Sequence, residues 1–248
     1  SAPAAQYTDT DYRDFLDASA LRGARIGVER SYFGADPHRD DLMEQAIVDM
    51  ANAGATIIDN ADLVNRSRIG APSYQVLLYE FKTDLELYFQ SVAPELNMRT
   101  LDDLIAFNEA NADREMPWFG QEIVIEAAAK GDLSTPEYLE SKETARRYSQ
   151  DEGIDWLMEE HQLDAIVAPT TRSAWKTDLI NGGISSLGSS SNAAVAGYPS
   201  ITVPMGFVHG LPIGMLFFSR AWDEGGLIRL AYSYEQATQH RRPAKMLP

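Results

Sequence analysis

The chain has 248 residues, of which 44% are hydrophobic and 23% charged, so its composition is that of an ordinary globular protein with enough apolar residues for a core. Its 37 acidic and 21 basic residues give a formal net charge of -16, which repels phosphate backbones and anionic lipid; we expect no nucleic-acid and no membrane partner. The absence of cysteine excludes disulfides, thiolate metal sites and cysteine nucleophiles.

The first residues contain neither the basic nor the apolar region of a secretion signal, and no apolar run approaches the roughly 18 residues that a membrane span needs. The chain begins with Ser1 and not with methionine, which suggests processing, a cut fragment or an expression scar. The sequence assigns no compartment, so the cytoplasm is only a default.

The opening segment predicts a strand, a helix and a second strand. Residues 24–28 form a short apolar run beside Gly23, and residues 56–58 form another. Between them, apolar residues recur at helical spacing after Pro37, and Gly54 fits the left-handed residue that ends a helix. Such a unit normally has parallel strands joined by a right-handed crossover, so we expect an α/β fold.

The middle of the chain, residues 73–161, has a mostly helical pattern. Thr100 is a predicted N-cap, and Thr135 precedes Pro136 at the start of a helix that we expect to run to Glu160. Seven apolar side chains at three- and four-residue steps predict a helix face that packs in a core: Tyr74, Leu77, Leu78, Phe81, Leu85, Tyr88 and Phe89.

The last third predicts three strands and a closing helix. Residues 165–168 are a buried strand ended by Pro169, residues 201–203 and 213–218 are further strands, and residues 223–237 form the helix. Glycine, serine and proline dominate residues 182–214. Such residues let the backbone approach a ligand closely, so the region is predicted to contain a site.

Most familiar catalytic patterns are absent. The four histidines do not lie at the spacing of helical zinc ligands, and no Gly-x-Ser-x-Gly elbow, phosphate loop or dinucleotide fingerprint occurs. We therefore expect neither a metal nor a cofactor, and each histidine is expected to be a surface or capping residue: His38, His161, His209 and His240.

Two short serine patterns leave alternatives open. Ser173 and Lys176 match Ser-x-x-Lys, and Ser190 and Asn192 match Ser-x-Asn, which are two of the three elements of penicillin-recognising acyl enzymes. The third element, Lys-Thr-Gly, is missing, and no helix is evident around Ser173. The serine-rich residues 182–192 fit either a loop whose amides and hydroxyls face a ligand or a turn before a close-packed helix.

A longer pattern begins at residues 192–204, where an asparagine and small residues precede Gly-Tyr-Pro and an apolar strand ending in Val-Pro. Gly-Leu-Pro-Ile-Gly follows at residues 210–214. Glu224 then opens a helix that contains Tyr-Ser-Tyr-Glu-Gln at residues 232–236. Together these features resemble the C-terminal part of the amidase-signature family.

Upstream segments extend the resemblance to nearly the whole chain. Residues 21–28 look like the strand that opens the C-terminal half of the family, and residues 164–170 look like its Asp-Ala-x-x-x-Pro-Thr strand. Residues 115–122 are similar to a segment of members related to peptide amidase. The resemblance implies part of a mixed-sheet α/β/α fold, with residues 1–248 as one domain that corresponds to the C-terminal half.

The resemblance also implies an amidohydrolase that needs neither cofactor nor metal. In the family one serine attacks the amide carbonyl, while a second serine in a cis peptide and a neutral lysine pass the proton to the leaving nitrogen. Those residues lie in the N-terminal half, and none of the five lysines here matches the catalytic one. We therefore assign no catalytic residue to this chain and expect it to be inactive alone.

The expected partners are a small amide substrate and the missing N-terminal half. An isolated half should expose a strand edge and apolar surface, through which it either pairs with that half or forms a homodimer. Candidate substrate-binding residues, for each of which a packing role is equally open, are Trp118, Phe119, Ser185, Ser186 and Asn192. The contrasting interpretation is a binding or scaffold module that keeps the fold without hydrolysis.

Overall fold

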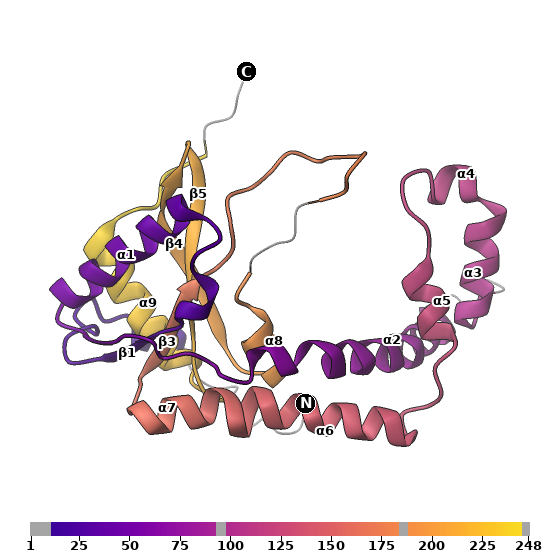
Figure 1. Cartoon of the computed structure of the whole chain (residues 1–248), viewed down its shortest axis with the longest axis horizontal. Helices are drawn as coiled ribbons and strands as arrows, with labels where there is room; N and C mark the ends of the chain where they lie inside the picture. Colours follow the sequence, from indigo (N-terminus) through magenta and orange to yellow (C-terminus); the bar gives the residue numbers. More distant parts are fainter. Residues whose placement is uncertain (1–10, 93–97, 184–187, 245–248) are drawn as a thin grey trace. The chain divides into compact units, whose positions relative to one another are not determined.

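The computed structural model describes residues 11–92, 98–183 and 188–244. The chain divides into two compact units (Figure 1). The first unit combines residues 1–66 with residues 148–248, and the second consists of residues 67–147. No helix in the described part of the chain is long and apolar enough to cross a membrane.

The first unit contains the sheet. Its strands are β1 (Arg25–Val28), β2 (Thr56–Ile58), β3 (Ala165–Pro169), β4 (Ser200–Val208) and β5 (Leu211–Phe218). Its α-helices are α1 (Pro37–Asn52), α7 (Asp155–His161), α8 (Ser191–Ala196) and α9 (Glu224–Thr238), and short 3-10 helices lie at Tyr12–Phe15 and Arg30–Tyr32.

The five strands form one mixed sheet in the order β2-β1-β3-β5-β4. The strand β1 runs parallel to both β2 and β3, whereas β5 runs antiparallel to both β3 and β4. The α/β class and the parallel opening unit are thus confirmed. Figure 1 shows α1 and α9 beside the long β4–β5 pair.

Local sequence explains the helix of the opening unit. The Asp36 side chain accepts a hydrogen bond from the backbone N–H of Arg39, and Pro37 occupies the first turn. At the other end Gly54 has a φ of 100°, a left-handed conformation that side chains rarely adopt. The predicted start and end of this helix are both confirmed.

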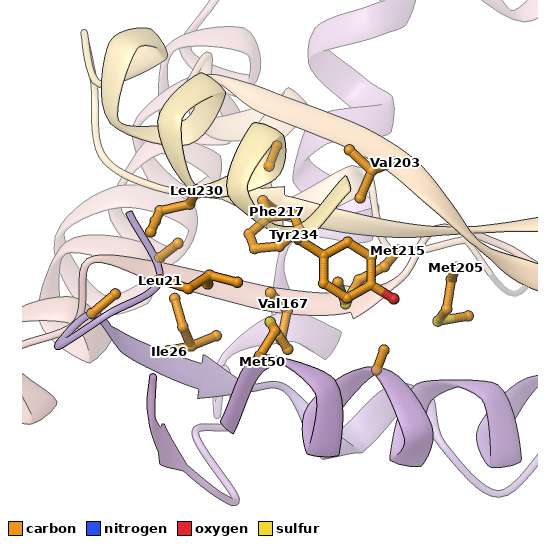
Figure 2. Close-up of a cluster of buried hydrophobic side chains, with 14 of the residues drawn as sticks. Leu21, Ile26, Met50, Val167, Val203, Met205, Met215, Phe217, Leu230 and Tyr234 are labelled. Carbon is orange, nitrogen blue, oxygen red and sulfur yellow. The ribbon is translucent and has the colours of Figure 1, made fainter. Parts of the chain in front are cut away.

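The two faces of the sheet bury two different apolar clusters because side chains alternate along each strand. In β3, Val167 joins one cluster while Ile166 joins the other, and in β5 Phe217 and Phe218 divide in the same way. Figure 2 shows the first cluster, where α1 and α9 cover the sheet. It includes Leu21, Ile26, Met50, Val167, Val203, Met205, Met215, Phe217, Leu230 and Tyr234.

The opposite face packs against α7 and α8. Leu157 and Met158 come from α7, and Ala193 and Ala196 come from α8. The small side chains of Ala193 and Ala196 are buried in this cluster. Residues 191–192 begin α8, as the interpretation of residues 182–192 as a turn before a close-packed helix requires, whereas residues 184–187 lie outside the described residues.

The second unit is helical. Its helices are α2 (Gly70–Val92), α3 (Leu101–Ala110), α4 (Ala112–Glu115), α5 (Glu122–Ala128) and the greater part of α6 (Pro136–Ser149), and the 3-10 helix Arg66–Arg68 precedes them. Thr100 caps α3 as predicted, in a capping box with Asp103. At the start of α6, the Thr135 hydroxyl donates to the carbonyl oxygen of Asp132 over 2.7 Å.

The prediction that the apolar stripe of α2 packs in a core is wrong for most of its members. Leu78 is fully buried, but four of the seven side chains are exposed: Tyr74, Leu77, Phe81 and Tyr88. Helical periodicity identifies an apolar face but contains no information about the surface that covers it.

The predicted helix from Pro136 to Glu160 is interrupted. A π-helical segment, Gln150–Ile154, separates α6 from α7, and Gly153 has non-helical torsion angles of φ -124° and ψ -112°. A Cβ atom at this glycine would collide with the carbonyl oxygen of Tyr148. The backbone conformation at Gly153 thus requires a residue without a side chain.

Candidate functional site

The first unit has a polar edge where two parallel strands end together. Val28 of β1 pairs with Val167 of β3, so the chain leaves both strands at the same edge of the sheet, at Glu29 and Thr170. The N–H of Glu29 donates to the carbonyl oxygen of Val167 over 3.0 Å. Open α/β sheets bind ligands outside the carboxyl ends of their strands, so this edge is the candidate site.

Glu29 is the buried acid of this edge, with no exposed surface. Its Oε1 accepts hydrogen bonds from the Ser31 hydroxyl over 2.6 Å and from the Leu63 N–H over 3.3 Å, while Oε2 is buried with no hydrogen-bond partner among the described residues. Burial raises the pKa of this carboxyl above its ordinary value, because the charged form loses its hydration.

Asn192 is one of the five predicted substrate-binding residues. It is 2% exposed at the start of α8, and its Nδ2 donates to the Tyr32 hydroxyl over 3.0 Å. The guanidinium of Arg66 lies 4.5 Å from the centre of the Tyr32 ring, and burial raises the pKa of the Tyr32 hydroxyl. The Asn192 amide thus links α8 to the segment that follows β1.

The residue after β3 is held firmly. The N–H of Thr170 donates to the Gly214 carbonyl oxygen over 2.8 Å, and its hydroxyl lies 2.6 Å from that of Thr202. The Ser189 hydroxyl donates to the Pro169 carbonyl oxygen over 2.8 Å. These bonds tie the end of β3 to β4, to β5 and to the residues before α8.

The three residues that follow each present a buried polar atom without a hydrogen-bond partner in the structure: Thr171 Oγ1, Arg172 Nε and Ser173 Oγ. Leaving such an atom unpaired costs about 1–3 kcal/mol, so runs of them are unusual in stable cores. Sequence reasoning missed Glu29, Thr171 and Arg172. A usable signal was their position, directly after buried parallel strands.

Residues 171–178 adopt neither helix nor strand, so Ser173 and Lys176 do not lie one helical turn apart. Ser190 and Asn192 stand at the start of α8, where the Asn192 amide already bonds to Tyr32. The arrangement of a penicillin-type acyl enzyme, with its lysine on the helix of the serine, is therefore absent from these described residues.

The other candidate residues have different surroundings. Trp118 and Phe119 lie in the second unit between α4 and α5, and they are 68% and 77% exposed. Ser185 and Ser186 lie outside the described residues.

The described part of the chain contains no group of three histidine, cysteine or acidic side chains that could hold a metal ion. The rings of His38 and His209 lie edge to face with centres 5.4 Å apart, and both residues are exposed at the surface.

The mixed sheet and its polar edge define an α/β protein with the ligand-site geometry of open sheets. The chain belongs to the amidase-signature family, whose Amidase model matches residues 3–228. It is 33% identical over 245 residues to a probable amidase of Arabidopsis thaliana, covering 95% of this chain and 42% of the relative.

Two solved structures show the same fold over almost the whole chain. A peptide amidase called PAM, crystallised with the competitive inhibitor chymostatin, is 43% identical with a TM-score of 0.88, covering 96% of this chain and 48% of the other. The native peptide amidase of Stenotrophomonas maltophilia is 44% identical with a TM-score of 0.84, covering 94% and 47%. The chain thus spans about half the length of these relatives.

Proposed function

We propose that residues 1–248 form the C-terminal half of an amidohydrolase that cleaves carboxylic amide C–N bonds without a metal or cofactor. The observation that supports this most is the family match over residues 3–228 in a chain that spans only 42% to 48% of three related proteins. The missing half would supply the nucleophilic serine, the bridging serine and the neutral lysine.

The surroundings of two of the five lysines bear on the assignment of this chain as the half without the triad. Lys82 Nζ donates to the carbonyl oxygens of Ala128 and Lys130, over 2.9 and 2.6 Å. The Tyr138 hydroxyl holds the pKa of Lys142 above its ordinary value, which favours the cation. A lysine that accepts a proton in the family mechanism must be neutral, so the surroundings of Lys142 do not suit that role.

The chain's contribution would be one wall of the substrate site, together with the polar edge of its sheet. The candidates for that wall remain Trp118, Phe119, Ser185, Ser186 and Asn192. The likeness to peptide amidases, at 43% and 44% identity, favours amides of peptides as the substrate class.

The partner that completes the enzyme would be the N-terminal half. The sheet supports this, because β2 and β4 are its edge strands and each pairs with one neighbour in the described structure. Edge strands offer unpaired backbone groups to another chain segment. Homodimerisation through the same surface is the competing outcome, and sedimentation of the 248-residue chain distinguishes a monomer from a dimer.

The experiment that tests the function is to sequence the gene upstream of the codon for Ser1 and to assay its whole product for ammonia release from peptide amides. We expect an upstream lysine, a glycine-serine signature and turnover by the whole product, with none by residues 1–248 alone. An upstream region without these residues would favour a binding or scaffold module. Turnover by residues 1–248 alone would refute the assignment of the missing triad.

A further inference from the structure

The segment of residues 170–176, directly after β3, has a fixed start and unpaired polar atoms. Thr170 is anchored through its N–H and its hydroxyl, so the segment leaves the sheet in a defined direction. Within the described part of the chain, the next three residues, Thr171, Arg172 and Ser173, each have a buried polar atom without a hydrogen-bond partner. Buried polar groups in folded proteins are nearly always paired, so we expect a further group to complete this segment.

The segment is locally cationic in a chain whose net charge is -16. It contains Arg172 and Lys176 and no acidic residue. The next carboxylate along the chain, Asp178, accepts hydrogen bonds from the backbone N–H groups of Ile180 and Asn181, each over 2.9 Å. It also accepts one from the Asn181 amide over 3.0 Å, so these contacts fold it onto its own turn.

The unpaired atoms favour an anionic oxygen ligand. The Nε of Arg172 is a donor, and the hydroxyls of Thr171 and Ser173 can both donate. A planar guanidinium recognises a carboxylate through parallel hydrogen bonds, which are shorter and stronger than those between neutral groups. The Trp175 side chain, 43% exposed in the same segment, offers an aromatic surface for an apolar part of the ligand.

We propose that residues 171–173 form a subsite for a carboxylate, with Arg172 as its charged member and the hydroxyls of Thr171 and Ser173 as further donors. This inference rests on the proposed amidase function: the carboxylate would belong to the amide substrate, at a position other than the bond that is cleaved. The preferred substrates are therefore amides that bear a free carboxylate.

The test is calorimetric titration of the 248-residue chain with N-succinyl-L-phenylalaninamide, which bears a free carboxylate away from its C-terminal amide, and with the uncharged N-acetyl-L-phenylalaninamide. We expect the carboxylate to bind at least 10-fold more tightly. Arg172→Gln should weaken binding of the carboxylate about 10- to 100-fold, the range for lost hydrogen bonds to a charged group. Arg172→Lys should weaken it less because the positive charge is retained.

The matched control is Arg13→Gln, which makes the same charge change at an exposed arginine whose partner is Asp11. It should leave carboxylate binding unchanged. Thr171→Val gives a second variant that removes one hydroxyl with little change of volume, and it should weaken carboxylate binding several-fold. Circular dichroism confirms that each variant is folded.

Equal binding of the two probes, no binding of the carboxylate, or unchanged binding by Arg172→Gln would each overturn the subsite. The last outcome would point to acceptor groups of the missing half as the partners of Arg172. Failure of the subsite is separable from failure of the amidase function. If the chain binds the carboxylate but the whole gene product hydrolyses no amide, the amidase function is refuted. If the whole gene product hydrolyses amides but Arg172→Gln does not change its preference for the carboxylate, only the subsite is refuted.

Discussion

The two units of the chain are stabilised in different ways. In the described structure, the sheet of the first unit separates clusters of nineteen and thirteen buried apolar residues, whereas the cluster of the second unit contains three. The second unit relies more on polar contacts, such as the bond of 2.6 Å from the Tyr79 hydroxyl to Glu137 and that of 2.8 Å from Tyr138 to Glu80. Apolar burial stabilises more than partly exposed hydrogen bonds, so the second unit should open at lower free energy.

The largest effect is expected in the core of the first unit. Phe217→Ala removes a fully buried ring from the cluster beneath α1 and α9 and should lower the free energy of unfolding by about 3–5 kcal/mol. Urea unfolding followed by circular dichroism measures it. The control is Leu211→Ala at the other end of the same strand, where the side chain is 41% exposed. Similar losses for the two variants would contradict the described core.

A leucine pair on α2 tests the second unit. Leu78 is fully buried and its neighbour Leu77 is 51% exposed. Leu78→Ala should cost about 2–4 kcal/mol, and Leu77→Ala about 0.5 kcal/mol or less. Hydrogen exchange should show faster exchange in α2, α3 and α5 for Leu78→Ala, with slow exchange retained in β3 and β5. Equal acceleration in both units would show that they unfold as one.

The polar edge predicts a pH dependence that the apolar core does not share. Glu29 has a raised pKa in the folded chain, so the folded state binds more protons than the unfolded state. The stabilising effect of the Glu29 carboxyl is complete below its pKa in the unfolded chain. The effect is lost as pH rises through its pKa in the folded chain. Glu29→Gln should flatten this fall in the free energy of unfolding, measured by urea titration from pH 4 to pH 8.

The control for that experiment is Glu159→Gln, which replaces an exposed carboxyl on α7. Its pH profile should match that of the unchanged chain. If the profile of Glu29→Gln also matched, burial of the Glu29 carboxyl would not be a source of the pH dependence.

The smallest effect concerns a helix end in the second unit. Thr100→Ala removes the hydroxyl that accepts from the Asp103 N–H over 3.2 Å and should cost about 1 kcal/mol. Thermal unfolding of the second unit measures the loss, and Thr100→Ser, which retains an accepting hydroxyl, should restore most of it. No recovery with serine would mean that packing of the threonine methyl group, and not the cap, stabilises α3.

Local patterns predicted much of the fold because their causes are local. The alternation and apolar runs of the strands, the cap of Thr100 and the left-handed Gly54 all depend on residues close in sequence. The break at Gly153 was missed because an isolated glycine within a helical pattern is often tolerated. Family membership was also readable, because the small residues, prolines and glycines of residues 192–214 form a specific order along the chain.

The candidate site was only partly predictable. Asn192 was selected from its motif, but its bond to Tyr32 joins residues far apart in sequence. Likewise, no pattern near Arg172 or Glu29 shows that their polar atoms are buried and unpaired, because burial depends on every element packed around them.

The sequence by itself determined the α/β class, most of the strands and helices, and the family, because these follow from short-range backbone preferences and residue order. Only the tertiary structure decided the order β2-β1-β3-β5-β4, which of the α2 side chains are buried, and which polar atoms are buried at the carboxyl edge of the sheet. Those outcomes depend on contacts between distant segments. Such contacts form when they lower the free energy of the whole folded chain through burial and hydrogen bonding. A short segment of sequence does not contain the information needed to evaluate that free energy.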